Sequence, residues 1–358
     1  MKKILISTGG SGGHVIPSLI IFDHLKNNFE TILVTDKRGT NFIDKNLYPF
    51  ELIDVPKINN SIFLFPKFLI LFIFSLIKSF FFLKKNKINI LISTGGYMSL
   101  PLCIISKLFK IKIILFEPNI VLGRSNKVIL KYAKRIICYH DKIINFPKKF
   151  YNKIMVINNL MRKETYNFEK KKNKEKLDTI KILVLGGSQG AFFFDKMVKD
   201  VIIKIYRLSK ISIYQQIFNL KNHKELENEF KKLNIDYEFF NYDKFLHKKL
   251  NTFDIAITRS GASALAELTF FNIPFIAIPF PYAKDNHQFY NAEFYNNKNS
   301  CWLVSQNNQC TDKIINIFKE VVENKKDYDI KKENLNKISY QNTWNNINKK
   351  LIDLINEN

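Results

Sequence analysis

The chain has 358 residues, which is enough for about two domains that each bury a hydrophobic core. Hydrophobic residues make up 46% and charged residues 25%, a composition that excludes wholesale disorder and a polytopic membrane protein. The formal net charge is +24, and 50 of the 56 basic residues are lysines. Such a surplus is typical of proteins that bind nucleic acid or anionic membranes, although an A/T-rich coding bias would also enrich Lys, Asn, Ile and Phe together.

The first half of the chain alternates apolar strands with helical segments. An apolar run at 3–7 leads into Gly9-Gly10-Ser11-Gly12-Gly13-His14, and a helix is predicted over 15–26. Further strands are predicted at 31–35, 88–93, 111–116 and 135–139. A strand, a glycine turn and a helix N-terminus form an anion site, because free amides and the helix dipole both favour phosphate.

An apolar stretch at 62–83 interrupts this alternation. At 100° per residue, Lys67, Lys78 and Lys85 fall on one side of a helix, between broad flanks of Phe, Leu and Ile that include Phe68 and Phe72. We expect this helix to lie in an anionic membrane surface, with lysines at the headgroups and aromatic rings in the acyl boundary. A helix packed on the domain and a membrane-spanning helix are the alternatives.

The second half opens like the first. A strand at 181–185 leads into Gly186-Gly187-Ser188-Gln189-Gly190 and a helix over 191–206, and later strands are predicted at 211–217, 237–240, 254–258, 274–278 and 301–304. The charge-rich segment 163–179 predicts a linker. The pattern predicts two Rossmann-like, doubly wound parallel-sheet α/β domains, 1–162 and 180–340, that face a central cleft, and a helix at 341–358 that could return to the first domain.

Several site types find little support in the residues. Neither glycine cluster fits G-x-G-x-x-G, so a dinucleotide cofactor rests only on Asp36 after the second strand. The cysteines lack CxxC spacing, and nucleic-acid binding rests on net charge alone. We therefore expect no cofactor, no metal and no nucleic-acid partner, with an NAD-dependent oxidoreductase and a basic nucleic-acid-binding protein as alternatives.

Six motifs follow one another along the chain. They are Gly9-Gly10-Ser11-Gly12-Gly13-His14, Gly95-Gly96-Tyr97-Met98-Ser99-Leu100-Pro101, Glu117-Pro118-Asn119 with Gly123-Arg124-Ser125-Asn126, Gly186-Gly187-Ser188-Gln189-Gly190-Ala191, Arg259-Ser260-Gly261-Ala262 with Glu267, and Asp285-Asn286-His287-Gln288 with Asn291. In this order, over nearly the whole chain, they resemble the MurG family of N-acetylglucosaminyltransferases. The chain departs from that family at Phe116 and Pro118, where His and Gln are usual, and at Leu160-Met161, where Pro-Val is usual.

The resemblance implies a fold and an activity. The fold is the GT-B glycosyltransferase architecture. The reaction is inverting, metal-independent transfer of GlcNAc from UDP-GlcNAc to the 4-hydroxyl of MurNAc in undecaprenyl-pyrophosphoryl-MurNAc-pentapeptide (lipid I), which yields lipid II for peptidoglycan. The enzyme would be peripheral, on the cytoplasmic face of the anionic inner membrane. Another two-domain glycosyltransferase with a different nucleotide sugar or lipid acceptor is the nearest alternative.

The resemblance also implies roles for individual residues. His14 and Glu117 are the candidates for the base that deprotonates the acceptor, and His14 is favoured because a helix N-terminus keeps an imidazole neutral. Arg162 would contact the UDP diphosphate, and Glu267 the ribose hydroxyls. Gln288 and Asn291 would present amides to GlcNAc. The remaining substrate-binding candidates are Ser11, Gly12, Gly13, Gly95, Gly96, Tyr97, Asn119, Ser188, Gln189, Gly190, Ser260, Gly261, Ala262, Ser263, Ala264, Leu265 and Ala266; the uracil contacts, near 239–246, stay unassigned.

Overall fold

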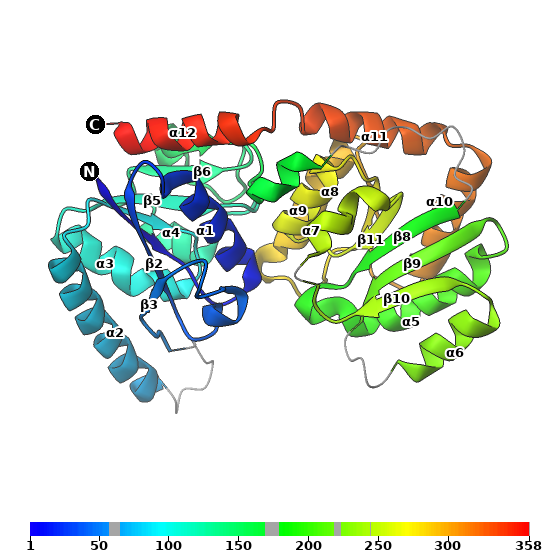
Figure 1. The fold of residues 1–358 in the computed structure, drawn as a ribbon, viewed down its shortest axis with the longest axis horizontal. Helices are drawn as coiled ribbons and strands as arrows, with labels where there is room; N and C mark the ends of the chain where they lie inside the picture. The colour runs from blue at the N-terminus through cyan, green and yellow to red at the C-terminus, as the bar shows by residue number, and fades with distance from the viewer. Residues whose placement is uncertain (57–64, 169–178, 218–222, 244, 358) are drawn as a thin grey trace. The chain divides into compact units, whose positions relative to one another are not determined.

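The protein was analysed as a computed structural model that describes residues 1–56, 65–168, 179–217, 223–243 and 245–357, with the side chains of 188–191 left out. It divides into two compact units: unit 1 comprises Met1–Lys163 and Thr343–Asn358, and unit 2 comprises Glu164–Asn342. Most of the expected linker, at 169–178, lies outside the described residues, as do residues 62–64 of the apolar stretch. Each unit is described by itself (Figure 1).

Unit 1 is built on a parallel sheet of seven strands in the order β3-β2-β1-β4-β5-β6-β7. Its elements are β1 (Lys3–Ser7), α1 (Gly12–Leu25), β2 (Glu30–Thr35), η1 (Gly39–Phe42), β3 (Phe50–Leu52), α2 (Phe65–Asn86), β4 (Ile90–Ser93), η3 (Tyr97–Ser99), α3 (Leu100–Leu108), β5 (Lys112–Glu117), α4 (Arg124–Ile129), β6 (Arg135–Cys138), η4 (Lys148–Lys153), β7 (Ile154–Val156) and α12 (Trp344–Asn356). The central strands are almost continuously apolar because helices cover both faces of the sheet.

The last helix, α12, belongs to unit 1 and packs on α1. The Trp344 ring stacks on the His24 ring with centroids 3.5 Å apart, and Lys2 Nζ donates to the carbonyl oxygen of Ile355 at 2.8 Å. The Thr343 side chain caps the helix by accepting from the backbone N–H of Asn346. The chain thus ends on the unit in which it begins.

Unit 2 contains a parallel sheet of six strands in the order β10-β9-β8-β11-β12-β13. Its elements are η5 (Lys163–Asn167), β8 (Thr179–Leu185), α5 (Gly187–Ile205), β9 (Lys210–Gln216), α6 (Lys224–Lys232), β10 (Asp236–Phe240), α7 (Leu246–Lys249), η6 (Leu250–Thr252), β11 (Ile255–Thr258), α8 (Ala262–Phe270), β12 (Phe275–Ala277), η7 (Lys284–Asn286), α9 (His287–Asn297), β13 (Trp302–Leu303), α10 (Cys310–Glu323) and α11 (Lys326–Ile338). Its largest apolar cluster joins one face of the sheet to α5, α6 and α10.

Both sheets reverse their strand order at a glycine-rich turn. In unit 1, β1 lies between β2 and β4, and in unit 2, β8 lies between β9 and β11. Open α/β sheets bind ligands beyond the carboxyl ends of their strands at such a reversal, where diverging loops leave space. The two predicted glycine turns therefore follow the strands at which each unit would bind a ligand. The prediction of two doubly wound parallel-sheet domains is confirmed.

Candidate functional site

The glycine turn of unit 1 is held by a buried carboxylate. Asp36, at the end of β2, is fully buried, and its Oδ1 accepts from the backbone N–H groups of Gly10 and Gly39 at 2.9 Å each. Its Oδ2 accepts from Arg38 Nε at 2.7 Å. A Cβ atom at Gly9 would lie 2.5 Å from Asp36 Oδ1, so only glycine fits there. Asp36 is thereby committed to the turn and unavailable to a ribose, so the interpretation of Asp36 as a dinucleotide contact is wrong.

His14 lies in the first turn of α1 with its ring orientation fixed. Nδ1 is 2.8 Å from the carbonyl oxygen of Thr94, which follows β4. A carbonyl can only accept, so Nδ1 carries the hydrogen and Nε2 of the neutral ring is left with its lone pair. The ring packs against Gly95 and Gly96, where an added Cβ would approach ring atoms to 3.3 and 3.5 Å. This geometry presents Nε2 as a proton acceptor.

Glu117, the other candidate base, ends β5 with only 3% of its surface exposed. Oε1 accepts from the backbone and side-chain N–H groups of Asn119 at 3.2 and 3.1 Å, and Oε2 accepts from Gly123 N at 2.8 Å and Asn126 Nδ2 at 2.9 Å. Burial raises the pKa of Glu117, and these four hydrogen bonds oppose the rise. A carboxylate whose oxygens all face N–H donors positions the loop after β5, and this favours His14 as the base.

The remaining acceptor-side candidates surround His14 within unit 1. Ser11 is exposed and caps α1 without a side-chain hydrogen bond, and it precedes the amides of Gly12 and Gly13 in the first helical turn. The Tyr97 hydroxyl accepts from Arg38, whose guanidinium carbon lies 4.8 Å from the centre of the Tyr97 ring. The carboxyl ends of β1, β4 and β5, adjacent strands of the sheet, thus bring together His14, Gly95, Gly96, Tyr97, Glu117 and Asn119.

In the corresponding turn of unit 2, fewer residues separate β8 from the following helix than predicted. Helix α5 begins at Gly187 rather than Ala191, and Gly187 has φ +64°, a left-handed conformation that favours glycine. The backbone N–H of Gly187 donates to Gln216 Oε1 at 3.0 Å, which ties the turn to the end of β9. Ser188, Gln189 and Gly190 fall in the first turn of α5, but the side chains of 188–191 lie outside the described residues.

The segment after β11 is braced by two amides from α9. Gln288 Oε1 accepts from the backbone N–H groups of Ser260 at 3.3 Å and Phe280 at 3.0 Å, so its Nε2 is oriented away from them. Asn291 Nδ2 donates to the Ser260 carbonyl oxygen at 3.1 Å, and the residue is only 3% exposed. Gln288 can thus offer a donor to a ligand, and Asn291 holds the Ser260 turn through its Nδ2; the contact of either residue with GlcNAc stays a prediction.

The predicted run 260–267 is only partly accessible. Gly261, Ala262, Ser263, Ala264 and Glu267 are half-exposed, and a Cβ at Gly261 would meet nothing within 4 Å. Ser260, Leu265 and Ala266 are buried, so any contact that they make with a ligand would involve their backbone or a small part of the side chain. Helix α8 turns Leu265 and Ala266 inward because one side of a helix faces the core, whereas Ser260 lies before the helix, just after β11. Arg162, in unit 1, is half-buried and forms no ion pair with a described carboxylate.

Comparison with known proteins identifies the family. Residues 4–138 match the glycosyltransferase family 28 N-terminal domain, and residues 181–347 match its C-terminal domain. The chain is 48% identical to the UDP-N-acetylglucosamine--N-acetylmuramyl-(pentapeptide) pyrophosphoryl-undecaprenol N-acetylglucosamine transferase of Pelagibacter ubique, covering 100% of this chain and 99% of the relative. The chain belongs to the MurG family.

Other relatives agree with this assignment. The enzyme of the same name from Rickettsia felis is 30% identical over 94% of this chain and 95% of its own length. The crystal structure of Acinetobacter baumannii MurG superposes with a TM-score of 0.77 at 20% identity, covering 99% of each chain. The predictions of a MurG-type N-acetylglucosaminyltransferase and of a GT-B fold are therefore confirmed.

In this MurG family member, helix α2 carries the predicted lysine stripe. Lys67, Lys78 and Lys85 are exposed, whereas Phe68 and Phe72 are half-buried and stack on each other. The outward apolar ridge instead consists of residues spaced by three or four positions: Ile70, Phe74, Ile77 and Phe81, which are 45–63% exposed. The opposite side, with Ser75, Ser79 and Leu83, is buried on the domain next to α3. Phe68 and Phe72 are only half-buried, so their contact with a membrane stays a prediction.

By length and composition α2 could cross a membrane. Its docking on α3, however, gives it one face in the core and one apolar face in solvent. The interfacial placement and the membrane-spanning alternative therefore both stay predictions.

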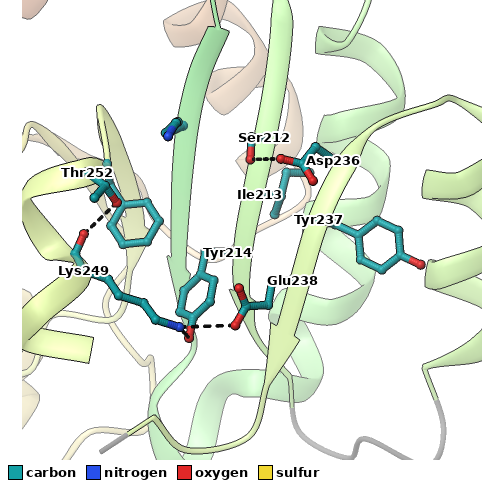
Figure 2. A pocket seen from close by; sticks show the side chains of 10 residues that line it. Ser212, Ile213, Tyr214, Asp236, Tyr237, Glu238, Lys249 and Thr252 are labelled. Atoms are coloured by element: carbon teal, nitrogen blue, oxygen red, sulfur yellow. Dashed lines mark hydrogen bonds and ion pairs between the residues drawn. The ribbon is translucent and has the colours of Figure 1, made fainter. Parts of the chain in front are cut away.

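A separate cavity of about 350 Å³ lies on unit 2 over β9 and β10 (Figure 2). Its polar groups satisfy one another: Lys249 Nζ donates to the Tyr214 hydroxyl at 2.7 Å and pairs with Glu238 at 3.2 Å, and the Ser212 hydroxyl donates to Asp236 at 2.9 Å. None of the predicted donor-binding residues lines it.

Throughout the described part of the chain, no group of three or more His, Cys, Asp or Glu side chains could hold a metal ion.

Sequence reasoning missed the roles of three residues at the site. Asp36 and Arg38 organise the unit 1 turn, and Asn126 reaches back to Glu117. Asn126 of α4 was part of a quoted motif, but its partner lies nine residues earlier, at the end of β5, and no local pattern reveals this pairing.

Proposed function

We propose that the protein transfers GlcNAc from UDP-GlcNAc to the 4-hydroxyl of MurNAc in undecaprenyl-pyrophosphoryl-MurNAc-pentapeptide, which converts lipid I to lipid II. The observation that carries this proposal is 48% identity over the whole chain to a relative whose name states this donor and acceptor. Identity of this extent covers both units, so both the donor and the acceptor sides of the relative have counterparts here.

In this proposal unit 1 binds the acceptor. The first-turn amides of Gly12 and Gly13 and the Ser11 hydroxyl face the lipid pyrophosphate, since a helix N-terminus favours an anion. His14 is the base: Thr94 fixes the tautomer that leaves Nε2 free to accept a proton. Asn119 contacts the acceptor sugar, and Glu117 keeps Asn119 in place through two hydrogen bonds.

Unit 2 binds the donor. Glu267 of α8 accepts hydrogen bonds from the ribose hydroxyls, and the α5 N-terminus with Ser188 faces the diphosphate. Gln288 directs its Nε2 toward an oxygen of the donor, because its Oε1 is already occupied by two backbone N–H groups. Arg162 neutralises the diphosphate as UDP departs.

The reaction is a direct displacement. The acceptor oxygen bonds to the anomeric carbon of GlcNAc as His14 Nε2 takes its proton, and the bond between that carbon and the UDP oxygen breaks with its electron pair on UDP. Attack from the face opposite the leaving group inverts the anomeric configuration.

The test is transfer of labelled GlcNAc from UDP-GlcNAc to a short-chain lipid I analogue by the full chain, with other UDP-sugars and other polyprenyl acceptors in parallel. We expect product only with the UDP-GlcNAc and lipid I pair. Preferential use of another sugar or acceptor would identify a different two-domain glycosyltransferase and overturn the proposal.

We further propose that unit 1 attaches peripherally to the anionic cytoplasmic face of the inner membrane through α2. The ridge of Ile70, Phe74, Ile77 and Phe81 would enter the acyl boundary, and the adjacent lysine stripe would bind the headgroups. A polyprenyl-linked acceptor requires this proximity in any case.

Vesicle sedimentation tests the attachment. Changing Lys67, Lys78 and Lys85 together to Glu should weaken sedimentation with anionic vesicles and leave UDP affinity intact. The matched control exchanges three exposed lysines of unit 2, Lys313, Lys319 and Lys326, for Glu, with the same change in net charge. Equal sedimentation of the two variants would refute a specific role for the stripe.

A further inference from the structure

Arg259, directly after β11, is a buried cation whose hydrogen-bond partners among the described residues are all neutral. The residue is 5% exposed, and Nη1 donates to the carbonyl oxygens of Ile278 at 3.1 Å and Pro279 at 3.2 Å. Nη2 donates to Gln306 Oε1 at 2.7 Å. Nε is buried and has no partner in the part of the chain that the structure describes. The guanidinium is therefore fixed in position but not neutralised.

Aromatic rings complete its surroundings. The guanidinium carbon lies 5.4, 4.8 and 5.4 Å from the ring centres of Phe193, Phe194 and Phe280, respectively. Such rings attract a cation but carry no net charge. Burial lowers the pKa of Arg259 to about 10, which still leaves it protonated at neutral pH.

An unpaired buried charge is unfavourable, and elsewhere in unit 2 the fold avoids it. Lys331 is equally buried, at 4% exposure, yet it pairs with Asp327 at 3.1 Å. No described carboxylate pairs with Arg259. Removing a charge from water without an opposite charge destabilises a fold, so a group retained in this state points to a counter-charge that arrives with a ligand.

The location of Arg259 indicates which ligand that is. A Cβ atom at Gly187 would lie 3.9 Å from Arg259 Cγ, so the side chain passes directly behind the turn that begins α5. The N-terminus of this helix adds positive potential at the same place. The guanidinium itself lies over Phe193 and Phe194 of α5, so two sources of positive charge lie near the strand-order reversal between β8 and β11.

We infer that Arg259 is a positioning residue that supplies a buried counter-charge to the donor diphosphate from behind the Gly186–Gly187 turn. This inference rests on the proposed function, because it takes the donor to be a uridine diphosphate sugar bound by unit 2. The fold accepts an unpaired charge in the free protein, and the negative ligand neutralises it on binding. The contribution of Arg259 to the binding free energy grows with the negative charge of the ligand and is largest for UDP, the departing product.

The test measures affinities of the full chain for uridine, UMP and UDP, which share one base but differ in charge. Arg259→Gln removes the charge and keeps a donor for a backbone carbonyl, and Arg259→Lys keeps the charge without the fork. We expect Arg259→Gln to bind uridine within about twofold of the unmodified chain and UDP about tenfold or more weakly. Arg259→Lys should retain most of the preference for UDP over uridine.

Stability gives a second readout that a purely structural arginine would not produce. Arg259→Gln removes hydrogen bonds to Ile278, Pro279 and Gln306 together with the charge, so the comparison is made between free and bound protein. UDP should raise the melting temperature of Arg259→Gln less than that of the unmodified chain, and uridine should raise both equally. Arg207→Gln, at the exposed arginine beside Tyr206 in the same unit, is the control and should change neither quantity. An equal loss of uridine and UDP affinity, or no loss of either, would overturn the inference. If the unmodified chain binds none of the three ligands, the proposed function itself fails.

Discussion

The sharpest test of the catalytic assignment is the replacement Glu117→Gln. The Glu117 carboxylate accepts four N–H groups from Asn119, Gly123 and Asn126. A glutamine has one oxygen in place of two, and whichever way its amide is turned, its NH2 group faces two of these donors. Each lost hydrogen bond to a charged group is worth about 1.5–3 kcal/mol, so the variant should lose about 3–6 kcal/mol of unfolding free energy.

This loss is a large part of the roughly 5–15 kcal/mol that stabilises a typical domain. It is measurable by urea unfolding of the full chain, with Glu30→Gln as the control. Glu30 is a half-exposed partner of Lys3 in unit 1, and its replacement should change the unfolding free energy by less than about 1 kcal/mol. A glutamine variant that keeps the unfolding free energy of the unmodified chain while its kcat falls at least about 100-fold would instead indicate that Glu117 is the catalytic base. That pair of results would refute the positioning role of Glu117.

Three further predictions follow from unit 1. His14→Ala should lower kcat by about 10²–10⁴-fold and leave UDP affinity, measured by calorimetry, unchanged; activity above a tenth of the original would exclude His14 as the base. Burial lowers the pKa of His24 from 6.5 to about 4, so the unfolded chain binds the proton more tightly than the folded chain does. The unfolding free energy should therefore fall by about 3 kcal/mol as the pH decreases from 6.5 toward 4, and it should not depend on His24 above pH 6.5. The unfolding free energy of His24→Gln should depend less on pH between these values. An unchanged pH dependence would contradict a lowered pKa of His24. Gly39→Ala places a Cβ 2.1 Å from Thr35 Oγ1 and 3.0 Å from Gly9 Cα, so thermal unfolding should occur at a lower temperature and a native-like melting temperature would show that the turn can relax.

Much of the architecture could be predicted from the sequence because its signals are local. Strands covered on both faces appear as short apolar runs, and glycine clusters follow the strands at which each sheet reverses its order. The edge strands β3 and β7 were missed, since each has three residues and none of them is buried. Six ordered motifs were sufficient to indicate the family, because their order along the chain does not depend on how it folds.

The roles of individual side chains were decided by tertiary structure. Whether Glu117 acts as a base or holds a loop depends on donors from residues 119–126, and the sequence does not show where that loop returns. The helical phase of α2 relative to the core turned Ser79 and Leu83 inward and Phe74 outward. Local sequence dictates which elements form, whereas burial and hydrogen-bond partners arise only when distant segments pack together, and these set the charge and availability of each functional group.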